Sequence, residues 1–197
     1  FAQNSEHLFY AYGWAQMHNH GNLLLKLYGQ ARGKATEFWG EDYLNSDLWV
    51  HTNNIPERAK RWVAEQDKPI GNFLQSFTDG INDYANAHPD KLSDEAKIVL
   101  PVTPRDPLAH FQRVILFHFV TDPEEGQFDP SHFISSKGSN AWAIGPSRSA
   151  SGNAMLIANP HLPWGDMFTW FESHLVSPDV NIYGAALVGM PFLGIAF

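Results

Sequence analysis

The sequence contains no cysteine and few basic residues. Its 197 residues include 13 Lys and Arg against 21 Asp and Glu, which gives a formal net charge of −8. Without cysteine there is neither a disulfide framework nor a thiolate metal site. An acidic chain lacks the basic face that nucleic acids and anionic membranes require, and no apolar run approaches the roughly 18 residues of a membrane span. We therefore expect no nucleic-acid partner and no membrane span.

Charge of either sign is almost missing from the last part of the chain. After residue 138, only Arg148, Asp166, Glu172 and Asp179 are charged. So few charges cannot form an ordinary solvated surface, and the pattern favours a sheet that is covered on both faces. Aromatic residues, by contrast, make up 14% of the chain. They provide core area, and they can also line an apolar ligand pocket.

Hydrophobic periodicity divides the sequence into three parts. Residues 1–120 repeat apolar side chains at helical spacing, with an interruption at Gly21. Residues 121–138 lose this periodicity and contain clusters of Pro, Gly and Asp, which is typical of a linker. Residues 139–197 hold short apolar runs between turn residues, which predicts antiparallel strands and an α+β fold. The runs are Ala141–Ile144, Ala154–Ala158, Phe168–Val176, Val180–Val188 and Leu193–Phe197.

One motif stands where the linker meets the first strand. Residues 138–142 read Gly-Ser-Asn-Ala-Trp, and Asn-Pro-His follows at residues 159–161. A serine hydroxyl is a poor nucleophile unless a base lies within hydrogen-bond reach. If the chain were cut between Gly138 and Ser139, the new α-amine could be that base, because its ordinary pKa of roughly 7.7–8.0 leaves part of it unprotonated near neutrality. The hydroxyl could make this cut itself by attacking the preceding carbonyl.

These residues resemble the penicillin amidase family of N-terminal nucleophile hydrolases. Further segments are similar to the family's sequence, namely Gly13–Gln16, Ala31–Gly40, Phe171–Leu175 and Gly184–Pro191. The form of residues 159–164 is closest to the branch that contains the acyl-homoserine lactone and aculeacin acylases. The resemblance implies an αββα sandwich and an amide hydrolase, or acylase, whose nucleophile is Ser139.

The resemblance also implies how such an enzyme matures and what it acts on. Cleavage between Gly138 and Ser139 would give a heterodimer of the two products, with residues 1–120 in the small subunit and Ser139 opening the large one. Family members are exported, which implies a periplasmic or secreted protein. The substrate would be a small-molecule N-acyl amide, with acyl-homoserine lactones favoured and penicillins or cephalosporins as the alternative. No cofactor is implied.

Several further residues are candidates for the site. The resemblance places His161 beside the nucleophile, although a loop histidine bonded only to backbone is the alternative. The candidates for the acyl cleft are Leu162, Trp164, Phe168, Met190 and Phe119, and for each a place in the core stays open. His18 and His20 would diverge on a helix, so we expect no metal site.

Two expectations limit what this chain does by itself. The family's oxyanion hole uses a backbone N–H and an Asn side chain farther along than Phe197, so we expect a fragment that is inactive alone. The alternative function is a non-catalytic scaffold, in which Ser139 is a buried strand residue and the aromatic residues are core.

Overall fold

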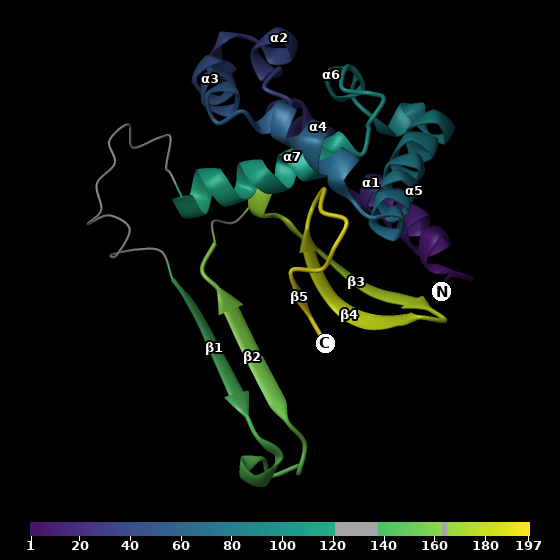
Figure 1. The fold of residues 1–197 in the computed structure, drawn as a ribbon, viewed down its shortest axis with the longest axis vertical. Coiled ribbons are helices and arrows are strands. Elements are labelled where there is room, and N and C mark those ends of the chain that lie inside the picture. Colours follow the sequence, from purple (N-terminus) through teal and green to yellow (C-terminus); the bar gives the residue numbers. More distant parts are fainter. Residues whose placement is uncertain (121–137, 163–164) are drawn as a thin grey trace.

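Helices form the first part of the structure and antiparallel strands the second (Figure 1). The structure is a computed structural model that describes residues 1–120, 138–162 and 165–197, without the side chains of residues 118 and 119. The helices are α1 (Ser5–Ala31), α2 (Ala35–Trp39), α3 (Leu44–Thr52), α4 (Ile55–Glu65), α5 (Lys68–Ala87), α6 (Asp94–Lys97) and α7 (Arg105–Val114), which a π-helical turn (Ile115–Val120) extends. The strands are β1 (Ser139–Ile144), β2 (Met155–Pro160), β3 (Trp170–Ser177), β4 (Val180–Leu187) and β5 (Ile195–Ala196).

The long helices α1 and α5 pack closely against each other. Gly13 on α1 and Gly80 on α5 make this possible, because a Cβ at either position would collide with a carbonyl oxygen of the other helix. The interruption predicted at Gly21 is a kink one residue earlier, at His20, whose φ of −135° and ψ of 27° are not helical. Gly21 instead leaves room for Leu92, whose Cδ2 would lie 2.7 Å from a Cβ there. No helix in the described ranges is long and apolar enough to span a membrane.

A buried carboxylate ties the end of α1 to the start of α7. Asp106 accepts hydrogen bonds from Arg32 Nε at 2.6 Å and Arg32 Nη2 at 2.8 Å. It also accepts from the backbone N–H of Thr103 at 2.7 Å. Charge-assisted bonds of this bidentate kind are strong and directional, so the pair sets the relative position of the two helices.

The second sheet shares a core with the helices. Its strand order is β3-β4-β5, all antiparallel. Ala186 on β4, followed by Val188 and Met190, lies in one buried cluster with Tyr28 and Phe77 of the helices. The helices and this second sheet therefore form one packed body, as burial of a common apolar surface requires.

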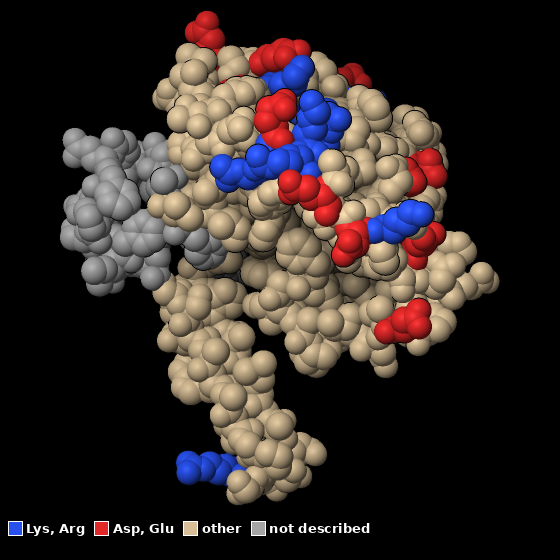
Figure 2. Space-filling model, in the orientation of Figure 1, with Lys and Arg blue, Asp and Glu red and all other residues tan. Residues whose placement is uncertain are grey.

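Strands β1 and β2 form a two-stranded hairpin that projects from this body (Figure 1). All their residues are exposed except Ile144 and Pro160, which are half-buried, and the large side chains of Trp142 and Leu156 keep 55% and 62% of their surface. Charged residues gather over the helices, and the hairpin of β1 and β2 is nearly free of them (Figure 2). The predicted sheet covered on both faces is thus wrong for this hairpin, because no second layer packs on it within the described residues.

A turn after β4 is held by buried polar side chains from the helices. The Gln16 side chain bonds it twice, accepting from the Gly189 N–H at 2.8 Å and donating to the Met190 carbonyl at 2.9 Å. The Tyr28 hydroxyl donates to the Gly189 carbonyl at 2.6 Å. Since these backbone groups are buried, each bond offsets a desolvation cost that would otherwise oppose folding.

His110 of α7 completes this arrangement. Its Nε2 lies 3.1 Å from the Val188 carbonyl, so the ring must carry its proton there to donate. Burial, followed by the nearby Arg113 cation, lowers the pKa of His110 to about 3, against a weaker opposite effect of the Val188 carbonyl. Burial also raises the pKa of Tyr28 well above its ordinary value, so both groups are neutral near pH 7. The turn clamp, as we name it, consists of Gln16, Tyr28 and His110.

Candidate active site

Ser139 is the first residue of β1 and lies opposite Pro160 of β2. Antiparallel strands alternate between hydrogen-bonded and non-hydrogen-bonded pairs. The His161 N–H donates to the Gly138 carbonyl at 3.2 Å, so the next pair, Ser139 with Pro160, is the non-hydrogen-bonded kind. That position suits a proline, which has no N–H to donate. The N–H of Ser139 therefore points away from β2, toward the free edge of the hairpin.

The peptide bond between Gly138 and Ser139 is accessible. Both residues are exposed, and a Cβ at Gly138 would meet nothing within 4 Å. The carbonyl oxygen of this bond accepts a hydrogen bond from the His161 N–H, just after β2, while the Ser139 N–H points away from that strand. The scaffold alternative expected a buried Ser139, and the structure contradicts that expectation because neither helices nor the second sheet cover β1 in the described residues.

The His161 ring contacts Asn140, the residue after Ser139. Its Nε2 lies 3.1 Å from the Asn140 Nδ2. Side chains alternate along a strand, so Asn140 lies on one face of the hairpin and Ser139 on the other, and the ring of His161 is on the Asn140 face. The contact of His161 with the Gly138–Ser139 peptide bond is through its backbone N–H. Contact between its ring and the nucleophile of the cut chain stays a prediction.

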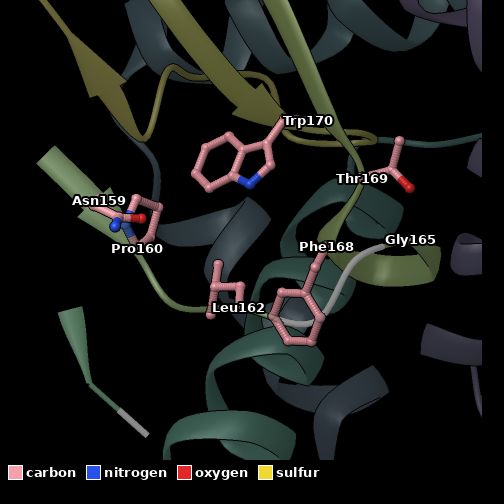
Figure 3. A pocket seen from close by; sticks show the side chains of 7 residues that line it. All are labelled: Asn159, Pro160, Leu162, Gly165, Phe168, Thr169 and Trp170. Carbon is pink, nitrogen blue, oxygen red and sulfur yellow. The ribbon is translucent and has the colours of Figure 1, made fainter.

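A cavity of about 420 Å³ begins next to Ser139's partner on β2 (Figure 3). Its lining residues are Asn159, Pro160, Leu162, Gly165, Phe168, Thr169 and Trp170. Two of the predicted cleft residues, Leu162 and Phe168, are among them, and the Trp170 ring faces the same space (Figure 3). A concave, largely apolar site of this size can take an acyl chain.

Of the other predicted cleft residues, only Met190 has a side chain that the structure describes. Met190 is buried in the shared core, where 3% of its surface is exposed, and it does not line this cavity. Trp164 and the side chain of Phe119 fall outside the described residues. Sequence reasoning missed Thr169 and Trp170, which lie just before and at the start of β3. The signal for Trp170 was its place near the start of the predicted strand Phe168–Val176, two residues after Phe168.

A charged residue, Asp166, directly follows the lining residue Gly165. Asp166 has a left-handed backbone with φ of 49°, an uncommon conformation outside glycine. Burial lowers the pKa of Arg113 on α7 to about 10, and attraction from Asp166 and Asp47 partly opposes this. Asp166 thus supplies negative potential toward a buried cation of the helical part. No group of at least three His, Asp or Glu side chains converges as metal ligands in the residues that the structure describes.

Comparison with known proteins finds similarity to one family along the whole chain. The family model for penicillin amidase matches residues 1–197. An acyl-homoserine lactone acylase PvdQ of Pseudomonas savastanoi pv. phaseolicola is 27% identical over 234 aligned residues, covering 100% of this chain and 30% of that relative. The aculeacin-A acylase of Actinoplanes utahensis is 39% identical over 59 residues, covering 29% of this chain and 8% of that relative.

A solved structure supports the same fold. The thermostable penicillin G acylase of Alcaligenes faecalis superposes with a TM-score of 0.52 at 22% sequence identity, covering 60% of this chain and 67% of that one. The chain spans about 30% of the length of the PvdQ relative. With a family match over its full length and the fold of an N-terminal nucleophile hydrolase, the chain belongs to the penicillin amidase family.

Proposed function

We propose that the protein containing this chain is an acylase that cuts its own chain between Gly138 and Ser139 and then uses Ser139 as its nucleophile. The observation that carries the proposal is the hydrogen bond from the His161 N–H to the Gly138 carbonyl. This N–H donates to the oxygen that becomes negative when the Ser139 hydroxyl attacks the Gly138 carbonyl carbon. Stabilising that negative charge is the role of an oxyanion hole. The apolar cavity begins beside this bond, at Pro160.

The cut is an exchange of an amide for an ester. The Ser139 Oγ bonds to the Gly138 carbonyl carbon, and the negative charge of the tetrahedral intermediate rests on the oxygen that His161 contacts. The C–N bond then breaks, and the hydroxyl proton ends on the new α-amine. Water hydrolyses the ester, which leaves a carboxylate at Gly138 and a free hydroxyl on Ser139. No other reactant is needed.

Turnover would use the same hydroxyl with the new amine as base. Since the Ser139 N–H points to the free edge of β1, the amine would lie in an open position after the cut. It would take the proton from Oγ as the hydroxyl attacks the substrate amide, and deliver it to the leaving amine. The acyl group would remain on Oγ as an ester until water releases it as a carboxylic acid.

The substrate class follows from the cavity and the relatives. The cavity lining is mostly apolar, which suits a fatty or aromatic acyl group. The relatives are named acyl-homoserine lactone acylase, aculeacin-A acylase and penicillin G acylase. We therefore propose acyl-homoserine lactones as the first substrate class and penicillins or cephalosporins as the second.

The two products of the cut would stay together. The shared core and the turn clamp both join residues before the linker to residues after it. We therefore propose a heterodimer of the cleavage products, and a periplasmic or secreted location as implied by the family resemblance.

The proposal is tested on the full-length protein and its Ser139→Ala variant. Intact mass and N-terminal sequencing of the wild type should reveal a chain that begins Ser-Asn-Ala-Trp, and the variant should stay uncut and inactive. A wild-type protein that hydrolyses amides without being cut would contradict the mechanism. A rate series over acyl chain length then separates the substrates, because a rise to long fatty chains indicates an aliphatic cleft and a sharp optimum at phenylacetyl indicates a penicillin acylase.

A further inference from the structure

We propose that Asn140 is a positioning residue for the self-cleavage step. The inference rests on the proposed function, and it concerns how His161 is held rather than which atom attacks. Two hydrogen bonds carry it, from the Asn140 side chain to the His161 ring at 3.1 Å and from the His161 N–H to the Gly138 carbonyl at 3.2 Å. Together they link the residue after the scissile bond to the oxygen before it.

The backbone at His161 has little else to hold it. It follows Pro160, where β2 ends, and a proline contributes no N–H to the strand ladder. Within the described residues, the ring of His161 has Asn140 as its hydrogen-bond partner. The ring is exposed, so burial does not fix it either. Anchoring the ring therefore limits how far the backbone N–H can drift from the Gly138 carbonyl.

The contact also sets the tautomer of the ring. The Asn140 atom that faces the ring is Nδ2, an amide nitrogen that can donate but cannot accept. With the Asn140 amide in this orientation, the Nε2 of His161 is the unprotonated acceptor, and the ring proton lies on Nδ1. The alternative for His161 was a loop histidine that is bonded only to backbone. That alternative does not require the ring proton to lie on Nδ1.

Two substitutions separate the contact from the size of the side chain. In the full-length protein, Asn140→Leu keeps the volume but removes the donor, and we expect self-cleavage to slow by roughly three- to tenfold, the value of one lost hydrogen bond. Asn140→Asp can accept from the opposite tautomer of the ring, so it should restore cleavage to near the wild-type rate. The rate is the half-time for loss of the uncut chain by intact mass. Asn153→Leu, in the exposed turn of the same hairpin, is the matched control and should cleave normally.

A second measurement does not depend on the fold of these variants. Nitrogen-15 NMR of histidine in the uncut Ser139→Ala protein, with the signal assigned by His161→Gln, should show Nε2 without its proton. A ring protonated at Nε2, or an Asn140→Leu protein that cleaves at the wild-type rate, overturns the inference while leaving the proposed function intact. Cleavage that persists in Ser139→Ala instead removes the proposed function, and this inference with it.

Discussion

At the scale of single residues, one glycine shows how strongly the turn after β4 is constrained. Gly189 has φ of +88°, and a Cβ there would lie 3.0 Å from Tyr28 Cε1 and 3.1 Å from His110 Cδ2. Gly189→Ala should therefore destabilise the uncut protein by about 2 kcal/mol, from backbone strain and crowding together. Urea unfolding in the Ser139→Ala background measures this. Gly71→Ala is the control, because that position is helical with nothing within 4 Å, and it should be neutral or stabilising.

A second prediction at this scale concerns the general base of turnover. If the α-amine of Ser139 is the base, activity should rise as the amine loses its proton, with an ordinary pKa near 7.7–8.0 that desolvation of the ammonium would lower. His161→Gln keeps the backbone N–H and a side-chain acceptor for Asn140, so the acid limb of the rate profile should persist. Loss of that limb, with the Ser139 terminus still formed, would reassign the base to the imidazole.

At the scale of elements, the turn clamp joins the helices to the end of β4. Gln16→Leu leaves the buried Gly189 N–H and Met190 carbonyl without their partner. Each of the two unpaired buried groups costs about 1–3 kcal/mol, so we expect a loss of about 2–6 kcal/mol in the unfolding free energy of the uncut protein. Gln75→Leu is a matched control, since its side chain bonds Asp79 at an exposed site on α5. An equal loss in both variants would show that the clamp adds nothing specific.

The strands themselves were predictable as local patterns, while their surroundings were not. The runs predicted at Ala141–Ile144 and Ala154–Ala158 correspond to β1 and β2, with ends that differ by up to two residues. Alternation and turn residues are local, so they can be read from sequence. Whether a strand is covered depends on distant elements, and for this reason the prediction of a doubly covered sheet failed for the hairpin.

At the scale of the whole molecule, stability should depend on pH through His110. Its pKa falls to about 3 on folding because the ring is buried, while the unfolded chain has the ordinary value near 6.5. The unfolded state thus binds the proton first, and stability is full above pH 6.5 and declines as the pH falls toward 3, by up to about 4–5 kcal/mol.

His110→Gln can still donate to Val188 but has nothing to protonate. We expect the difference in unfolding free energy between wild type and this variant to change with pH across that window, in the uncut background. His7→Gln, at an exposed position, should leave the profile unchanged. A flat difference for His110→Gln would mean that the ring is not buried as a neutral group.

The sequence by itself determined the division into a helical first part and a strand-rich second part, the position of Ser139 at the start of a strand, and the family. These features depend on neighbouring residues, whose periodicity and motifs survive without knowledge of the fold. Only the tertiary structure decided that the His161 N–H meets the Gly138 carbonyl, that the Asn140 side chain contacts the His161 ring, that Trp170 lines the cavity and that Met190 is core. Each of these contacts depends on strand register or on packing between residues far apart in sequence. A shift of the strand pairing by one residue would change which residues meet, although the local sequence pattern would stay the same.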